Sequence, residues 1–264
     1  LGVLRHAINQ KLRQERMQEV FDEARKIQMS ILPRRTPVYG GFELYGRIQP
    51  MESVGGDFYD YIPITDKILG LAIADVSGHG LPAALQVRDI YMGLRMGMAR
   101  DFKIVRTVER LNQIIHKSTL TSRFVSMFYG ELEPNGVFIY VNAGHPAPFH
   151  LSATGDVRNL DEGGPVLGPL AEATYERGFI RLNPGDMVVL YTDGMIEATP
   201  AGSDGGEEFG IERLVEIARR LRGKSSKEIA ETMMKAVEAY RGEGEAQDDR
   251  TVVVVTYPPA PAGN

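Results

Sequence analysis

The sequence predicts an α+β fold in which helices cover layers of β-sheet. Runs rich in β-branched and aromatic residues come in blocks, helical segments follow them in pairs, and a long helix precedes the first strand. Strict alternation of strand and helix would predict a parallel sheet instead, and this chain lacks it. With 264 residues, 43% of them hydrophobic, the chain is long enough to bury a sizeable core.

The first predicted element is a helix from Leu1 to Ile31. Apolar residues recur mostly at gaps of three and four, and proline first appears at Pro33 and Pro37. Its other positions are dense in Arg, Lys, Glu and Gln. Two interpretations stay open: a coiled coil, or an amphipathic helix packed on its own domain.

Strand-like runs and paired helices fill the rest of the chain. The strand-like runs are FELYGRI, KILGLAIADV, RFVSMFYGELE, GVFIYVNA, RGFIRL, DMVVLYTD and TVVVVTY. The helical segments are expected at residues 81–100, 104–118, 211–222 and 226–240. We therefore divide the chain into a helical linker (1–37), one catalytic-size domain (38–257) and a disordered tail (258–264).

Composition narrows the classes of function. The 30 basic and 35 acidic residues are interspersed, so no basic surface for nucleic acid is expected. The chain has no cysteine, which excludes a thiol nucleophile and thiolate metal sites and fits a cytoplasmic setting. No apolar run is long enough for a membrane span. Because the chain starts at Leu1 rather than methionine, we expect a fragment whose upstream part could hold a sensor or a membrane tether.

Four aspartates share a local pattern, because each lies where a strand-like run meets a turn. They are Asp57 in VGGDFYD, Asp75 in LAIADVSGHG, Asp193 in VVLYTDGM and Asp248 in EAQDDRTVVVV. A single Asp-Gly is ordinary turn chemistry, but strand ends can bring several distant carboxylates together. Few cations lie nearby in the sequence to offset the cost of burying these acids. A divalent ion with oxygen ligands, Mg²⁺ or Mn²⁺, is therefore the expected partner.

Other templates fit less well. His79 in SGHGLP and His145 in NAGHPAP stand alone in predicted loops, without zinc-ligand spacing, so each is either a hydrogen-bonded loop residue or a group that orients substrate or water. The sequence has no GxSxG, GxxxxGK[ST] or GxGxxG motif in the required context. Serine hydrolase, P-loop and dinucleotide-binding functions lose their main support.

Five segments resemble, in order, the motifs of PPM-type metal-dependent serine/threonine phosphatases of the SpoIIE/RsbU branch. They are VGGDFYDY, ADVSGHGLPAAL, NAGHPAP, YTDGMIEA and QDDRTVVVV, and EARKIQMSILP before them resembles the entry to that catalytic domain. The resemblance covers roughly residues 24–256. It implies a β-sandwich of two antiparallel sheets flanked by helix pairs, with two Mn²⁺ or Mg²⁺ ions at one end.

The resemblance also implies a role for particular residues. Asp57, Asp75 and the backbone carbonyl of Val76 would bind metal, and Asp193 and Asp248 would complete the second ion's ligands. The supporting residues would be Gly56, Asp60 and Asp249, with His79 and His145 as further candidates. The ions would activate water for attack on a phosphoserine or phosphothreonine, without a covalent enzyme intermediate.

The chain also departs from the eukaryotic members of the superfamily. Where they carry a phosphate-binding arginine this chain has Glu52, and where they carry a histidine after the second aspartate it has Ser77, with His79 two residues on. The phosphate-binding group therefore stays open, and we favour water over His79 as the acid that protonates the leaving group.

The branch resemblance implies partners as well. The substrate would be a phosphorylated STAS-domain antagonist of an anti-sigma factor, and an upstream sensor would act through the leading helix, by dimerisation or by moving the helices at 81–118. Two alternatives remain: a phosphoprotein-binding module without catalysis, and a phosphoesterase for small molecules.

Overall fold

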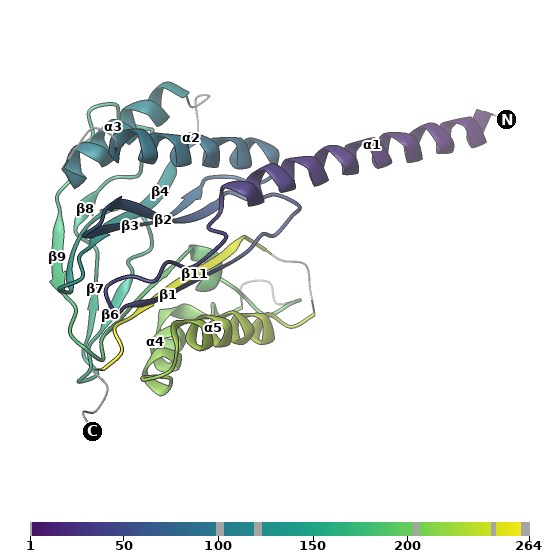
Figure 1. Cartoon of the computed structure of the whole chain (residues 1–264). Coiled ribbons are helices and arrows are strands. Elements are labelled where there is room, and N and C mark those ends of the chain that lie inside the picture. The colour runs from purple at the N-terminus through teal and green to yellow at the C-terminus, as the bar shows by residue number, and fades with distance from the viewer. Residues whose placement is uncertain (1, 99–102, 119–122, 203–205, 244–246, 260–264) are drawn as a thin grey trace.

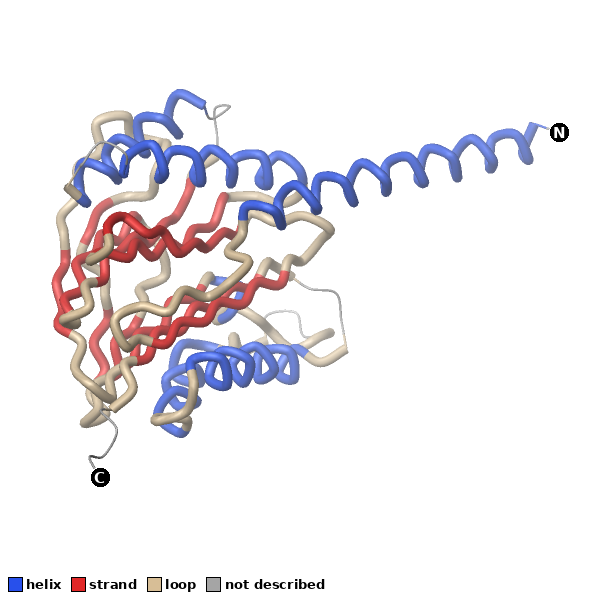
Figure 2. Tube along the Cα trace, viewed as in Figure 1, coloured by secondary structure: helices blue, strands red, loops and turns tan. Residues whose placement is uncertain are grey.

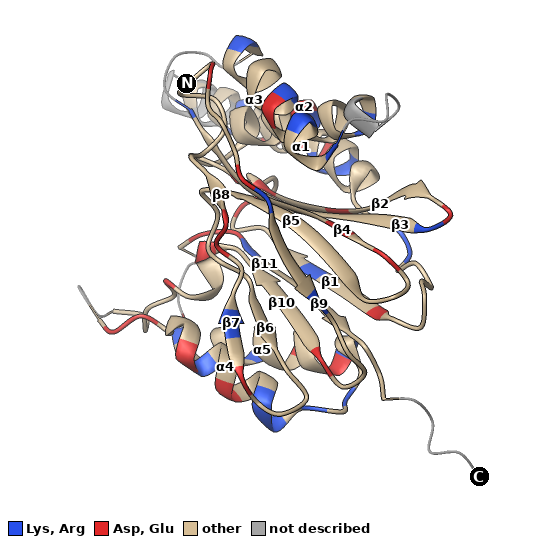
Figure 3. Cartoon of the chain, turned by 90° about the vertical axis from the view of Figure 1, so that its left-hand side faces the viewer, with Lys and Arg blue, Asp and Glu red and all other residues tan. Residues whose placement is uncertain are grey.

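The computed structural model describes residues 2–98, 103–118, 123–202, 206–243 and 247–259. Two β-sheets pack face to face, and a helix pair covers the outer face of each sheet (Figures 1 and 2). This four-layer arrangement is the α+β sandwich that the sequence and its resemblance predicted. Acidic and basic residues are interspersed over the elements rather than gathered by sign (Figure 3).

The first sheet is wholly antiparallel, in the order β1-β11-β10-β6-β7. Its strands are β1 (Glu43–Gln49), β6 (Phe149–Leu151), β7 (Val157–Asn159), β10 (Met187–Tyr191) and β11 (Arg250–Thr256). The last strand, β11, thus pairs with the first strand, β1, and lies inside the sheet between β1 and β10. This pairing joins segments about 200 residues apart, which a local sequence pattern does not reveal.

The second sheet has the order β2-β3-β4-β5-β8, with β9 also paired to β5. Its strands are β2 (Asp57–Thr65), β3 (Ile68–Val76), β4 (Val125–Leu132), β5 (Val137–Ala143), β8 (Gly163–Gly164) and β9 (Gly178–Arg181). Every pair is antiparallel except the short β5–β8 pair, which is parallel.

The helix pairs bury one face each against a sheet. Helices α2 (Leu81–Met98) and α3 (Ile104–Ser118) cover the β2-containing sheet, and α4 (Gly210–Arg220) and α5 (Ser226–Arg241) cover the other (Figure 1). Ser225 caps α5, because its side chain accepts a hydrogen bond from the Glu228 amide. A short 3₁₀ helix, η1 (Asp193–Met195), follows β10 directly.

Strict alternation along the central strands explains their continuous apolar runs. In β11, Val253 and Val255 enter the core between the sheets, while Val252 and Val254 enter the core under α4 and α5. A strand buried on both faces has no polar side, which is why TVVVVTY lacks the usual alternation. This alternation also decides which face each functional residue of β2, β3 and β11 presents.

Helix α1 (Gly2–Ile31) contacts the domain only near its C-terminal end and projects away from it over the rest of its length (Figure 1). Gln28 and Leu32 are buried, whereas Leu12, Met17 and Val20 are each about half exposed. The C-terminal turns therefore pack on the domain, as one of the two interpretations predicted. The projecting part keeps apolar side chains in solvent, and the coiled coil stays a prediction for it.

Several predicted boundaries differ from the structure. The sequence did not predict β2, β6, β7 or β8 as strands, and the pair Gly55-Gly56 directly precedes β2. The predicted helix 81–100 ends at Met98 as described, and residues 99–100 lie outside the described residues. Most of the predicted disordered tail, residues 260–264, lies outside them as well. The division of the chain at residue 37 stays a prediction.

Candidate active site

Two of the predicted aspartates face each other on neighbouring strands. Asp57 begins β2 and pairs in register with Asp75, one residue before the end of β3. By alternation, both lie on the face of their sheet that meets the other sheet, like Tyr59 and Ile73. The carboxylates therefore lie at one end of the space between the sheets.

The other two aspartates come to the same end from the opposite sheet. Asp193 opens η1 just after β10, and Asp248 lies two residues before β11. Because β10 and β11 are antiparallel neighbours, the end of one lies beside the start of the other. A Cβ on Gly194, the second residue of η1, would lie 3.3 Å from Asp248 Cβ, which places Asp248 beside η1. The charges of Asp193 and Asp248 both raise the pKa of Asp75.

Asp57 is the most buried member of the group, at 2% exposure. Its Oδ2 accepts hydrogen bonds from Thr192 Oγ1 (2.8 Å) and Thr251 Oγ1 (2.6 Å). Burial raises the pKa of Asp57 well above its usual range, and the charges of Asp75 and Asp249 add to this, while the two threonine bonds lower the pKa. The threonines thus orient and partly stabilise a carboxylate that otherwise resists ionisation.

The more exposed carboxylates have raised pKa values too. The pKa of Asp75 is raised to about 7. Burial is the largest cause, and repulsion by the charges of Asp193 and Asp248 adds to it. Burial is also the main cause of the raised pKa of Asp193 and of Asp248. Closely spaced acids with raised pKa values mark a site that a cation would stabilise.

Asp249 supports the site through the backbone instead of facing it. Its Oδ1 accepts a hydrogen bond from the Met51 amide and its Oδ2 one from the Gly56 amide, both 2.6 Å. A Cβ on Gly55 would lie 2.1 Å from Asp249 Oδ2. The loop of residues 50–56 can therefore wrap around this carboxylate only because residue 55 has no side chain.

Gly56 lies against the predicted carbonyl ligand. A Cβ on Gly56 would lie 2.6 Å from the Val76 carbonyl oxygen and 3.3 Å from Asp75 Oδ1. The Gly56 carbonyl in turn accepts a hydrogen bond from the Val76 amide (3.2 Å). The glycine thus keeps open the space in front of the Val76 carbonyl.

The donors fit a hard divalent ion in kind, since all are carboxylate or carbonyl oxygens. Among the described residues, however, no group of three or more His, Cys, Asp or Glu side chains is placed closely enough to coordinate one metal ion. Asp57, Asp75, Asp193, Asp248 and the Val76 carbonyl are the groups that would hold metal.

Asp60 links the site's strand to the covering helices. It is buried on β2, and Arg95 Nη2 on α2 donates a hydrogen bond to its Oδ2 at 2.6 Å. Burial raises the pKa of Asp60 to about 6, although the charge of Arg95 opposes this. Arg95 also lies 4.4 Å from the ring centroid of Tyr91. Asp60 therefore faces α2 and supports the site from behind.

The two candidate histidines differ sharply in environment. His79 is exposed, and its Nδ1 lies 3.0 Å from Glu52 Oε1, so the residue at the eukaryotic arginine position holds a histidine here. His145 is buried, with Nδ1 2.9 Å from Ser126 Oγ. Burial lowers the pKa of His145 to about 3, so its ring is neutral at physiological pH. His79 alone can reach a bound substrate from solvent.

Sequence reasoning missed residues that the fold brings to the site. Thr192 and Thr251 bind Asp57, and Gln28 on α1 brackets Gly55, donating from Nε2 to the Gly55 carbonyl (2.6 Å) and accepting from its amide (3.1 Å). TDG and DDRT contain the threonines, so their proximity to the acids was visible. Nothing in the polar helix distinguished Gln28 from its neighbours.

Known proteins resemble this chain in sequence. The family model described as "Stage II sporulation protein E (SpoIIE)" matches residues 65–258. "Protein IcfG" of Synechocystis is 29% identical over 74% of this chain and 35% of its own length. "Phosphoserine phosphatase RsbU" of Bacillus subtilis is 28% identical over 70% of this chain and 55% of its own. The chain thus spans between a third and about half of these two relatives.

Solved structures share the fold. The SiaA-PP2C domain of Pseudomonas aeruginosa superposes with a TM-score of 0.80 at 22% identity, covering 91% of this chain and 97% of that one. RsbX, solved in complex with magnesium, gives a TM-score of 0.61 at 17% identity over 84% of this chain and 98% of its own. Among the described residues, no helix combines the length and apolarity needed to span a bilayer. With the family model covering most of the sandwich, the chain belongs to the SpoIIE family of PP2C-type serine phosphatases.

Proposed function

We propose that this chain is the catalytic domain of a metal-dependent protein phosphatase that hydrolyses phosphoserine or phosphothreonine. The observation that carries the proposal is the convergence of four aspartates, from both sheets, at one end of the sandwich, with raised pKa values. The names of RsbU and RsbP, both phosphoserine phosphatases, support the same reaction class.

The four aspartates would have different roles in binding a phosphorylated substrate. Asp57, held by two threonine hydroxyls, has a fixed orientation, while the more exposed Asp75, Asp193 and Asp248 form the side that solvent and substrate can reach. Two Mn²⁺ or Mg²⁺ ions bound there would supply activation of water and neutralisation of phosphoryl charge. The exposure of Asp248 and the partial exposure of Asp75 and Asp193 suit a phosphoryl group carried on a protein.

The substrate we propose is a phosphorylated STAS-domain protein, with an upstream sensor in the longer protein and cytoplasmic location for this domain. Similarity to RsbU supports this choice. A phosphoesterase for small molecules shares the same acids, and a non-catalytic binding module would bind the phosphoprotein without turnover. The intact set of four aspartates favours turnover.

Hydrolysis assays test the proposal. We expect Mn²⁺-dependent release of phosphate from a phosphoserine STAS protein, loss of that activity with chelator, and a fall of at least about a hundredfold in Asp193→Asn. Asp66→Asn, an exposed aspartate in the β2–β3 turn, is the matched control and should stay active. Activity that survives both chelator and Asp193→Asn would refute the metal-dependent mechanism, and turnover of small esters alone would favour the phosphoesterase.

A further inference from the structure

A small cavity lies beside η1 on the side of β11 away from the space between the sheets. It has a volume of about 110 Å³, and its lining includes Gly194, Glu197, Arg241, Asp248 and Arg250. Asp248 is also one of the four converging aspartates. The cavity therefore adjoins the candidate metal centre while being separate from it.

Arg250 is the unusual member of the lining. It is 3% exposed and lies on the face of β11 shared with Val252 and Val254, under α5. Its Nη1 is buried and has no hydrogen-bond partner among the residues that the structure describes. Leaving the Nη1 group of a buried guanidinium without an acceptor costs folding free energy, and a bound acceptor would offset that cost.

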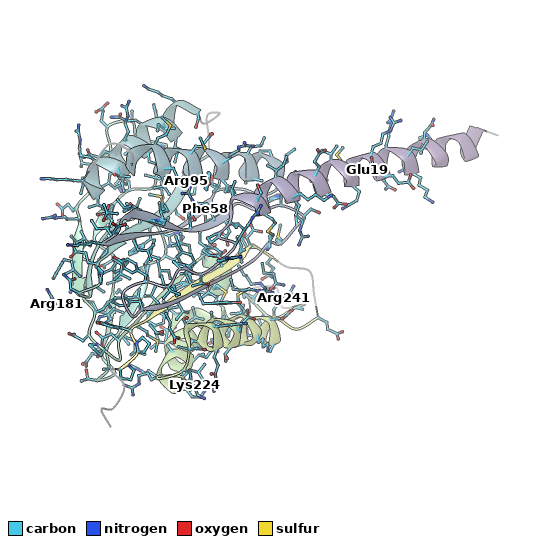
Figure 4. The ribbon with its side chains drawn as sticks, in the orientation of Figure 1. Glu19, Phe58, Arg95, Arg181, Lys224 and Arg241 are labelled. Carbon is cyan, nitrogen blue, oxygen red and sulfur yellow. The ribbon has the colours of Figure 1, made fainter. Side chains whose placement is uncertain are left out.

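Arg241 brings a second guanidinium group to the same cavity. It is the last residue of α5 (Figure 4), and it lines the cavity together with Arg250. The Glu197 and Asp248 side chains, the acidic part of the lining, are solvent-exposed. Two planar guanidinium groups around one small cavity present the paired donors that carboxylates and phosphates accept.

We propose that this cavity binds the carboxylate of an Asp or Glu side chain of the substrate, a few residues from its phosphoserine. The inference rests on the proposed phosphatase function. Asp248 borders both the cavity and the metal centre, so a peptide whose phosphoserine reaches the aspartates can place a neighbouring side chain against Arg241 and Arg250. The cavity would thus select acidic sequences around the phosphorylated residue.

Peptide binding to a protein without turnover tests this selection directly. Asp193→Asn protein with Mn²⁺ is titrated with two labelled phosphoserine peptides that differ only in Glu against Gln near the phosphoserine, and anisotropy is recorded, with the Glu placed at several offsets. We expect one offset at which the Glu peptide binds about tenfold more tightly. In Arg241→Gln combined with Asp193→Asn, that ratio should fall to about one.

Two further variants separate recognition from folding. Arg250→Lys retains the charge but loses the planar fork, so the ratio should fall while the thermal unfolding temperature stays near that of the parent. Arg220→Gln, an exposed arginine on α4 away from the cavity, should keep the ratio unchanged. The ratio is compared within each variant, so a general loss of peptide affinity does not imitate the result.

Each contrary outcome has a distinct meaning. A Glu-to-Gln ratio near one at every offset, or a ratio that Arg241→Gln does not change, overturns the proposed subsite. Binding of inorganic phosphate that depends on Arg241, with no preference for the Glu peptide, assigns the cavity to free phosphate and also overturns it. If wild-type protein hydrolyses no phosphopeptide but the ratio is present and depends on Arg241, the phosphatase proposal fails while the subsite stands.

Discussion

At the scale of single residues, the site depends on how each carboxylate is held. Asp57 is almost completely buried, yet two hydroxyls from different segments donate to the same oxygen, Oδ2. Its Oδ1 accepts no hydrogen bond from the residues that the structure describes, so one oxygen is fixed by the fold and the other is left to a ligand. The threonines therefore matter for metal binding without being ligands themselves.

Replacing Thr251 with valine removes one of these donors at nearly constant shape. We expect Mn²⁺ affinity, measured by isothermal titration calorimetry, to fall about tenfold, because Asp57 loses orientation and its pKa rises further. Thr256→Val is the matched control, since Thr256 lies buried on the same strand with a hydroxyl that has no described partner. Equal Mn²⁺ affinity in the two variants would show that the Thr251 hydroxyl does not position Asp57.

His145 makes stability depend on pH. Its folded-state pKa of about 3 lies below the usual 6.5, so as pH falls below 6.5 the unfolded chain takes up a proton that the folded chain refuses. Its contribution to stability is therefore complete above pH 6.5 and decreases as pH falls toward 3.

Between pH 7 and pH 5, we expect the free energy of unfolding of wild type to fall by about 2 kcal/mol relative to that of His145→Asn. Urea unfolding at both pH values measures it, and subtracting the variant removes the effect of the carboxylates, whose raised pKa values act in the opposite direction. A difference that is constant over this range would mean that the buried imidazole accepts a proton in the folded state.

At the scale of elements, helix α1 holds the loop that precedes Asp57. Gln28 forms two hydrogen bonds with Gly55, and Asp249 binds the neighbouring amides from the other side. The loop of residues 50–56 is thus fixed between a helix from one end of the chain and a strand from the other. Movement of α1 would displace this loop first and, through it, Asp57.

Gln28→Ala should loosen the loop without unfolding the domain. The buried Gly55 amide loses its acceptor, at a cost of about 1–3 kcal/mol, so amide hydrogen exchange over residues 50–57 should accelerate while β10 and β11 stay protected. Gln18→Ala is the control, because the side chain of Gln18 is exposed and bonds Asp22 on the same helix. Unchanged exchange over residues 50–57 would show that α1 does not support the site.

At the scale of the whole molecule, the projecting part of α1 exposes several large apolar side chains to solvent. Leu12, Met17 and Val20 lie exposed on a helix without a partner there, and Ile27 is 49% exposed closer to the domain. Helices of this kind gain stability by pairing their apolar stripes. A homodimer through α1 is the arrangement we propose for the longer protein.

Replacing Val20, Phe21 and Ile27 with aspartate should convert such a dimer to monomers, because the charges cannot be buried between helices. Light scattering measures the mass, and phosphate release measures any change in activity. Gln10→Asp with Gln14→Asp adds charge at exposed polar positions and is the control. A mass and an activity that both match wild type in the triple variant would contradict the proposed role of α1.

The local patterns of the sequence were sufficient to predict the fold class and the aspartates of the candidate site. Continuous apolar runs, paired helices and the leading helix predicted a layered α+β fold, and four aspartates at strand ends predicted where carboxylates meet. These features are local, because side-chain periodicity and turn chemistry act over a few residues. The strand at Asp57–Thr65 escaped because Asp57, Asp60 and Pro63 interrupt its apolar residues and two glycines precede it.

Only the tertiary structure decided which residues act on those acids. Thr192 and Thr251 bind Asp57 across 135 and 194 residues of sequence, and Gln28 reaches Gly55 from the helix. It also decided that β11 lies between β1 and β10, which brings Asp248 beside Asp193 and turns Arg250 toward α5. Such contacts follow from strand order and burial on both faces of a sheet, and these are set by packing of the whole chain rather than by any local preference.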